Sequence, residues 1–289
     1  MGLGMATSCV RAGLTVHGID TNPDRVTALV AAGGQALTAD SPVADIIVCV
    51  VLNADQTRSA LFGTDGLGGL AARLRPGGVI ISCATVPPAF AREMETQAHA
   101  RGLHYLDAPI SGGAAKAGLG KLSVMAAGTA DAFAAARPAL DAMAETVFEL
   151  GDTAGPGSAM KAVNQMLAGV HIAAMAEAMT FGMTQDIAPE TFLAVIRQCA
   201  GTSWMLENRA PHIVAGDYTP HSQINIWPKD LGIVLDIARD ARFSAPITAA
   251  ALQQYLAAAG MGLGHEDDAA VAKVYARNAQ LTLPGEGEA

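Results

Sequence analysis

Apolar runs separated by helical patterns constrain the fold of the first half of this chain more than any other feature. The run "ADIIVCVVLN" (44–53) is apolar without a break, which suits a parallel strand covered on both faces. Further strands are expected at 14–20, 77–85, 103–111, 121–128 and 146–151. Helical patterns alternate with these runs, and the first opens with Asn22 as its cap before Pro23. This alternation predicts an α/β fold built on a doubly wound sheet.

The pattern changes at "GDTAGPGSAMK", where glycine and proline mark a boundary. Beyond it the sequence contains no convincing strand. Helices are expected at about 158–185, 189–199, 203–215, 228–242, 245–259 and 266–279. The sequence therefore predicts a sheet domain over residues 1–153 and an all-helical domain over residues 154–289.

The opening "MGLGMATSCVRAGLTVHGID" matches part of a dinucleotide-binding fingerprint: strand, G-x-G-x-x-G, helix, then a second strand that ends in an acid. Asp20 supplies the acid. Gly2 and Gly4 look like the first two glycines, but only about eight residues separate Gly4 from Gly13, which is too short for the helix. Gly2 fits better as the third glycine of a Rossmann-like domain whose first strand is missing. We expect that strand upstream of Met1, removed by a misplaced start codon or by trimming, with natural truncation as the alternative.

The motif "DAPISGG" (107–113) ends a strand in a Ser-Gly-Gly turn. The backbone N–H groups of Ser111, Gly112 and Gly113 can form a small anion cradle, because glycine leaves them unobstructed. Such a cradle suits a carboxylate. A purely structural turn is the alternative interpretation.

The motif "GPGSAMKAVNQ" (155–165) places Lys161 near the start of the long helix. The positive end of the helix dipole disfavours a charged lysine, and partial burial in a domain cleft acts in the same direction. A lysine in that setting can take a proton from an alcohol near neutral pH. Asn164 and Gln165 share its helix face and can hold a substrate. A solvated lysine is the alternative.

Polar residues at the ends of other elements are candidate ligand contacts. Lys229, at the head of the helix in "WPKDLGIVLDIA", is a second cation in an unfavourable dipole position. Its neighbour Asp230 is simplest to interpret as the cap of that helix. Asn53 and Thr85 end two strands, at the edge where open parallel sheets bind ligands.

Composition and charge exclude several classes of protein. The formal net charge of −9 and the lack of a basic face argue against a nucleic-acid partner. No uninterrupted apolar run is long enough to span a bilayer, so we expect no membrane association. The four cysteines are expected to be buried free thiols, and no His/Cys spacing suits a metal. A cytoplasmic location fits this cysteine usage.

Three motifs in this order, "DAPISGG", "GPGSAMKAVNQ" and "WPKDLGIVLDIA", resemble the β-hydroxyacid dehydrogenase family over essentially the whole chain. Within it, "QMLAGVHIAAMAEAM", "GTSWMLENRAPHIVAGDYTPHS" and "HEDDAAVAKVY" are similar to the threonate branch. The resemblance implies NAD-dependent oxidation of the 2-hydroxyl of a four-carbon sugar acid. It also implies a homodimer or homotetramer. Another family activity, of the 3-hydroxyisobutyrate or tartronate semialdehyde type, stays open, as does a truncated chain that binds no dinucleotide.

The resemblance also assigns residue roles. It implies Lys161 as the catalytic acid and base, and Asp20 as the residue that selects NAD over NADP by repelling a 2′-phosphate. Gly2 corresponds to the third glycine of the fingerprint. The remaining implied contacts are Ser111, Gly112 and Gly113 with the substrate carboxylate, and Thr85 and Lys229 with the nicotinamide end of the cofactor.

Overall fold

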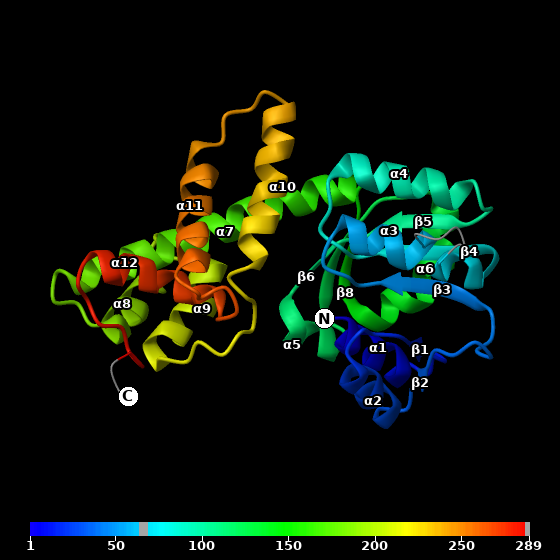
Figure 1. The fold of residues 1–289 in the computed structure, drawn as a ribbon, viewed down its shortest axis with the longest axis horizontal. Helices are drawn as coiled ribbons and strands as arrows, with labels where there is room; N and C mark the ends of the chain where they lie inside the picture. Colours follow the sequence, from blue (N-terminus) through cyan, green and yellow to red (C-terminus); the bar gives the residue numbers. More distant parts are fainter. Residues whose placement is uncertain (64–68, 287–289) are drawn as a thin grey trace. The chain divides into compact units, whose positions relative to one another are not determined.

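The computed structural model describes residues 1–63 and 69–286, which divide into two compact units, Met1–Lys161 and Ala162–Ala289 (Figure 1). The first unit alternates strands and helices, as a Rossmann-like α/β domain does. All the elements described in the second unit are helices. The predicted fold class, a doubly wound sheet domain followed by an all-helical domain, is confirmed.

The first unit contains strands, most of them paired in parallel, and the helices that connect them. Its elements are α1 (Gly2–Arg11), β1 (His17–Gly18), α2 (Pro23–Ala31), β2 (Gln35–Ala36), β3 (Ala44–Cys49), α3 (Ala54–Phe62), η1 (Leu70–Arg73), β4 (Leu74–Ser82), α4 (Pro88–His99), β5 (His104–Asp107), β6 (Ile110–Ser111), α5 (Gly113–Leu119), β7 (Leu122–Ala126), α6 (Ala130–Met143) and β8 (Ala144–Glu149).

The strands pair in three groups. β3, β4 and β5 are parallel in that order, β1 pairs with β2 in parallel, and β7 pairs with β8 in parallel and with β6 in antiparallel. Among the described residues, no ladder joins β1 to β3. In a doubly wound sheet of strand order 3-2-1-4-5-6, the first strand lies at that position. In the described residues, the β1–β2 and β3–β4–β5 ladders are therefore separate.

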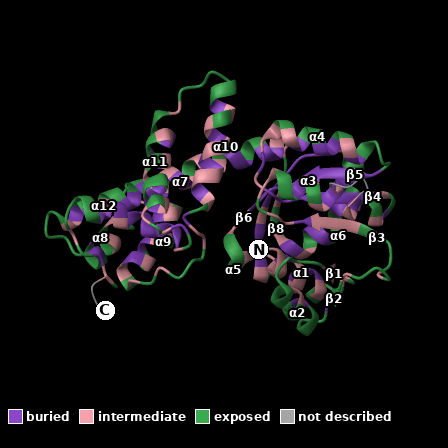
Figure 2. Cartoon of the chain, viewed as in Figure 1, coloured by how far each residue is buried: buried purple, intermediate pink, exposed green. Residues whose placement is uncertain are grey.

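Helices cover both faces of the central strands, which explains their continuous apolar sequence. On β4, Val79, Ile80 and Ile81 are fully buried. One face packs with residues of α1 and α6, including Met5, and the other with residues of α3 and α4, including Leu61. In Figure 2 the buried colour follows β5, much of β4 and the inner sides of the helices, whereas β3 is mostly intermediate.

The second unit is a helical bundle entered by the long helix α7 (Pro156–Met183), which begins in the first unit. Its other helices are α8 (Pro189–Ile196), α9 (Trp204–Ala215), α10 (Ile226–Asp240), α11 (Pro246–Gly260), η2 (Asp268–Val271) and α12 (Ala272–Asn278). By length and composition α7 could cross a membrane, and 44% of its most apolar window is buried in the protein. Because core helices of globular proteins share this property, it is weak evidence for a membrane span.

Several local expectations were wrong. The strand expected over 14–20 is reduced to β1, and the one over 103–111 breaks into β5 and β6. Helix α5 was not expected. Cys199 is exposed, whereas Cys9, Cys49 and Cys83 are buried as expected. Burial raises the pKa of Cys49 to about 11, which keeps this thiol protonated and unreactive at neutral pH.

Candidate functional site

The Ser-Gly-Gly turn lies where β6 ends and α5 begins. Gly112 is the N-cap of α5 with φ of 130°, and Gly113 has φ of 73°, conformations that L side chains rarely adopt. No side chain caps the first amides of α5. A turn with two glycines in these conformations at the start of a helix is compatible with the anion cradle expected from the sequence, which stays a prediction.

Lys116, which the sequence analysis did not select, lies beside this turn. A Cβ at Gly112 would lie 3.0 Å from both Cβ and Cδ of Lys116, so the stem of the lysine covers the glycine. The stem of a cationic side chain therefore lies beside the expected anion cradle. The spacing of Lys116 one turn after Gly112 in an alanine-rich helix was the available signal.

Asp107, at the end of β5, joins the strand before the cradle to the start of α7. Its buried carboxylate accepts hydrogen bonds from the backbone N–H groups of Gly155 and Ser158, each at 2.9 Å, and from the Ser158 hydroxyl at 2.6 Å. Burial raises the pKa of Asp107, against the lowering effect of these hydrogen bonds. The sequence analysis missed this role, although an acid at the end of a buried apolar strand was a signal for it.

Lys161 is the sixth residue of α7, three positions after Ser158. The helix dipole acts most strongly in the first turn, and Lys161 lies just beyond that turn. The residue is only 8% exposed, so the interpretation of Lys161 as a solvated surface lysine is wrong. Asp107 thus fixes the start of the helix that carries Lys161. Asp107 itself is four residues before Ser111, the first residue of the Ser-Gly-Gly turn.

Farther along α7, Asn164 and Gln165 form a polar chain with α10. The Asn164 amide donates to Gln165 Oε1 at 2.9 Å, and Gln165 Nε2 donates to Asp230 Oδ2 at 2.5 Å. Because a carboxylate only accepts, Asp230 fixes the orientation of the Gln165 amide. Asp230 also forms an ion pair with Lys229, with 2.5 Å between Lys229 Nζ and Asp230 Oδ1. The structure therefore brings Asn164, Gln165 and Lys229 together.

The expectation that Asp230 caps α10 was wrong. The N-cap of α10 is Asn225, and it makes no side-chain capping bond. Asp230 is the fifth residue of the helix, buried, and bonded to a side chain of α7 instead. Its role is to join two helices.

The predicted dinucleotide residues occupy positions that suit such a ligand. Helix α1 begins at Gly2, with no side chain bonded to its first amides, which leaves a helix N-terminus suited to phosphate. A Cβ at Gly4 would lie 2.8 Å from the backbone nitrogen of Gly118, so Gly4 permits close packing of α1 on α5. Asp20 follows β1 and lines a hollow of about 470 Å³ together with residues of α2.

Asn53 and Thr85 follow the carboxyl ends of the neighbouring strands β3 and β4. Asn53 is the N-cap of α3, and its side chain accepts a hydrogen bond from Gln56 N at 2.9 Å. A second hollow, of about 340 Å³, lies near the amino ends of β4 and β5, away from these residues. Within residues 1–63 and 69–286, no cluster of His, Cys, Asp and Glu is suited to a metal ion.

Comparisons with known proteins match nearly the whole chain. Residues 1–151 match the NAD binding domain of 6-phosphogluconate dehydrogenase, and residues 155–275 match the NAD-binding model of NADP-dependent 3-hydroxyisobutyrate dehydrogenase. The chain is 44% identical to L-threonate dehydrogenase of Cupriavidus necator over 291 residues, which cover 100% of this chain and 96% of that protein. It is 43% identical to L-threonate dehydrogenase of Pectobacterium atrosepticum over 293 residues, covering 100% and 94%.

A solved structure is similar over nearly the same length. The crystal structure of 3-hydroxyisobutyrate dehydrogenase from Salmonella typhimurium matches with a TM-score of 0.88 and 44% identity, covering 94% of this chain and 95% of that one.

Proposed function

The chain belongs to the β-hydroxyacid dehydrogenase family, and from that premise we propose that it oxidises the 2-hydroxyl of a four-carbon sugar acid with NAD. It is an NAD-dependent hydroxyacid dehydrogenase, with a nicotinamide dinucleotide as cofactor and a small hydroxy acid as substrate. Full-length similarity to two L-threonate dehydrogenases is the observation that carries the finer assignment.

Lys161 is the proposed acid and base. In the oxidation, its neutral amine accepts the proton of the substrate hydroxyl, and in the reverse reaction its ammonium form returns that proton. The nicotinamide, when bound, supplies the acceptor for the hydride that leaves the same carbon. The burial of Lys161 and the fixed start of α7 support this role, because a general base must be held within reach of the proton that it removes.

The Ser-Gly-Gly turn is the proposed holder of the substrate carboxylate. The backbone N–H groups of residues 111–113 donate to it, and the nearby Lys116 adds favourable charge. Asn164 and Gln165 are proposed to hold the remaining hydroxyl groups. The bonds that Gln165 makes to Asn164 and Asp230 support this role, because they restrict the orientation of both amides.

The cofactor residues are proposed in two groups. At the adenosine end, Asp20 binds the ribose hydroxyls and disfavours a 2′-phosphate, and the start of α1 at Gly2 faces the pyrophosphate. At the nicotinamide end, the contacts are Asn53, Thr85 and Lys229. The hollow beside Asp20 and the uncapped start of α1 support the fit to a dinucleotide.

A substrate panel tests the proposal. The purified chain is assayed with NAD or NADP against L-threonate, 3-hydroxyisobutyrate and L-serine, and with NADH against tartronate semialdehyde. We expect the highest kcat/KM with L-threonate and NAD. Preference for 3-hydroxyisobutyrate or tartronate semialdehyde would favour the other family activities, of which the first gains support from the solved relative of 44% identity. Thermal unfolding with NADH separates substrate choice from cofactor binding, because a bound ligand raises the midpoint.

The remaining parts of the proposal concern organisation. We assign cofactor binding to residues 1–153 and substrate binding with self-association to residues 154–289. A homodimer or homotetramer is supported by α7, where Val163, Leu167 and Phe181 are exposed apolar side chains. A cytoplasmic location is supported by the free cysteines, including the exposed Cys199.

A further inference from the structure

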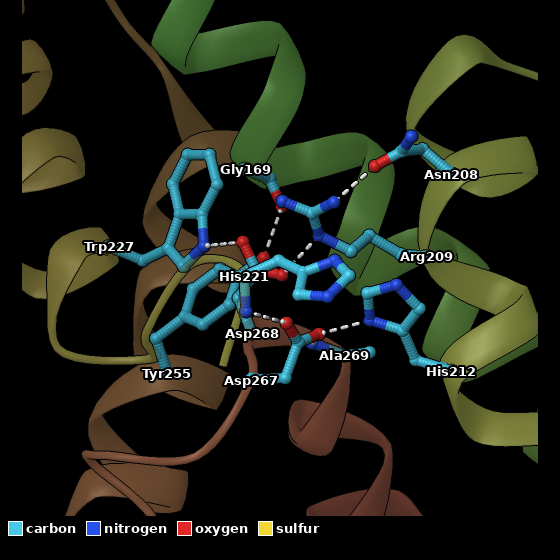
Figure 3. Close-up of polar contacts among 10 residues, drawn as sticks. All are labelled: Gly169, Asn208, Arg209, His212, His221, Trp227, Tyr255, Asp267, Asp268 and Ala269. Atoms are coloured by element: carbon cyan, nitrogen blue, oxygen red, sulfur yellow. Dashed lines mark hydrogen bonds and ion pairs between the residues drawn. The ribbon is translucent and has the colours of Figure 1, made fainter. Parts of the chain in front are cut away.

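Two adjacent carboxylates, Asp267 and Asp268, join separate segments of the helical unit (Figure 3). Both are fully buried. Asp267 contacts α9 and the loop that follows it, and Asp268 contacts α9 and the first turn of α10. These contacts connect the motifs "GTSWMLENRAPHIVAGDYTPHS", "WPKDLGIVLDIA" and "HEDDAAVAKVY". The proposed reaction gives these three motifs no common role.

Asp268 has one charged and one neutral donor. Its Oδ1 accepts from Arg209 Nε at 2.5 Å, and its Oδ2 accepts from the indole Nε1 of Trp227 at 3.0 Å. Burial raises the pKa of Asp268, and the charge of Arg209 and the bond from Trp227 oppose this effect. Because a buried ion pair adds little net stability, the geometry of this contact points to a positioning role.

Trp227, which donates to Asp268, also packs against helices α11 and α7. Its ring stacks on Tyr255 of α11, with 5.5 Å between the ring centroids and 26° between the planes. Tyr255 in turn donates from its hydroxyl to Gly169 O of α7 at 2.8 Å. A Cβ at Gly169 would lie 2.9 Å from Trp227 Cε3, so the indole packs directly on the α7 backbone.

Helices α7 and α10 contact each other again one turn away, at the proposed site residues. Trp227 and Asp230 are three residues apart on α10, and Gly169 and Gln165 are four apart on α7, so each pair shares a helix face. Asp230 bonds Gln165 across this contact and pairs with Lys229. A rotation of the first turn of α10 would therefore move Lys229 and Gln165 together.

We propose that Asp268 is a positioning residue, which fixes the first turn of α10 through Trp227 and so sets the position of Lys229 and of the Asp230–Gln165 pair. The inference rests on the proposed function, in which Lys229 contacts the cofactor and Gln165 the substrate. It adds a residue that touches neither ligand.

Asp267 stabilises the neighbouring segment on which this arrangement rests. Its carboxylate bonds His212 Nδ1 at 2.9 Å, the backbone N–H of His221 at 2.9 Å and that of Ala269 at 3.1 Å. The rings of His212 and His221 lie edge to face, with centroids 4.7 Å apart. Asp267 therefore caps η2 and ties its start to α9 and to the loop at His221, while Asp268 bonds a side chain of α10.

The decisive variant is Trp227→Phe, which keeps an aromatic ring against Tyr255 but removes the indole N–H. The full chain is titrated with NADH, and steady-state constants are measured with NAD and L-threonate. We expect the Kd for NADH to rise about 3- to 30-fold, the range over which residues without ligand contact modulate binding, with a smaller change in kcat. Asp268→Asn should act in the same direction, and Asp236→Asn, which removes an exposed ion pair on the same helix, is the matched control.

A double-mutant cycle identifies the route. Combined with Lys229→Ala, Trp227→Phe should have no further effect on the NADH Kd. An unchanged Kd in Trp227→Phe, or the full effect retained beside Lys229→Ala, would overturn the proposal. If Lys229→Ala itself leaves the Kd unchanged, the assignment of Lys229 in the proposed function fails as well.

Two measurements on the free protein test the positioning role even if the chain binds no NADH. Amide hydrogen exchange over residues 226–232 should become faster in Trp227→Phe and Asp268→Asn but not in Asp236→Asn. In a Trp204→Phe background Trp227 is the sole tryptophan, and its emission should shift when Asp268 is replaced by Asn. Unchanged exchange and emission would overturn the positioning role whatever the activity, whereas a change in both without NADH binding would count only against the proposed function.

Discussion

Each unit contains a buried carboxylate that contacts the first turn of a helix carrying a proposed site lysine. The donors to the two carboxylates differ. In the sheet unit, Asp107 accepts from the Ser158 hydroxyl and from two backbone N–H groups, all without formal charge. In the helical unit, Asp268 accepts from the Arg209 guanidinium and from an indole N–H. The first arrangement uses the amides of a helix N-terminus, and the second uses a buried counter-charge.

This difference decides what a substitution leaves behind. When Asp107 becomes Asn, the remaining donors are neutral, and the amide oxygen can still accept from part of them. When Asp268 becomes Asn, a guanidinium whose side chain is 11% exposed loses the carboxylate that pairs with it. Equal changes in sequence should therefore have unequal costs in stability.

The largest expected effect separates the two lysines that these helices carry. Lys161→Ala should lower kcat by about 10²- to 10⁴-fold, because general acid–base catalysis contributes about that much. Lys229→Ala should act mainly on the KM for NAD, because a cofactor contact is made in the ground state as well. Steady-state kinetics with L-threonate measures both. Near-normal turnover in Lys161→Ala would end its assignment as acid and base.

The next effect compares the carboxylates themselves. Asp268→Asn should lower the free energy of unfolding by about 3–5 kcal/mol, the usual cost of a buried charge left without its partner. Asp107→Asn should cost less, about 1–2 kcal/mol, since it weakens hydrogen bonds without leaving a charge. Urea unfolding of each full-length variant measures the difference. Equal losses would mean that the charge of Arg209 plays no special part.

A pair of serines sharpens the comparison at smaller scale. Ser158 donates to a buried carboxylate, whereas Ser203 caps α9 in the ordinary way, accepting from Leu206 N at 3.1 Å. Ser158→Ala should therefore cost about 1.5–3 kcal/mol, as hydrogen bonds to charged groups do, and Ser203→Ala about 1 kcal/mol. The same urea experiment applies. A larger loss in Ser203→Ala would contradict the view that Asp107 holds α7 through Ser158.

The features that the sequence could predict are those set by neighbouring residues. Apolar runs and helical periodicity are local, so they gave the doubly wound sheet and the helical second half. The alanine-rich stretch that forms α5 lacks such a period, and this helix was missed. The Ser-Gly-Gly turn was found because its backbone demands glycine at two adjacent positions.

Partners distant in sequence could not be predicted. Asp230 was expected to cap its own helix, yet its partner Gln165 is 65 residues away. Arg209 and Asp268 are 59 residues apart, and Asp107 is 51 residues before Ser158. A single sequence shows that such groups are polar and set among apolar residues. Only the fold shows which donor satisfies which acceptor.

The smallest expected effect is in the pH dependence of stability, and for Asp107 its sign follows from burial. Burial raises the pKa of this carboxyl, and the bonds from Ser158 and Gly155 oppose the rise without cancelling it. The folded protein therefore holds the Asp107 proton more tightly than the unfolded chain. As the pH falls from above the folded pKa to below the ordinary value of about 3.9, Asp107 should contribute increasing stability. The difference between the parent and Asp107→Asn should grow over this interval.

Asp267 in the helical unit should show the opposite sign. Burial would raise its pKa, but hydrogen bonds from His212 and from the backbone N–H groups of His221 and Ala269 outweigh burial and lower it. Its contribution is complete above the ordinary value of about 3.9 and is lost as the pH falls through the folded pKa, so the advantage over Asp267→Asn should shrink in acid. Urea unfolding of the parent and both variants between about pH 2 and pH 6 gives the two differences. If both differences moved in the same direction, the donors around the two carboxylates would not differ in the way that their geometry indicates.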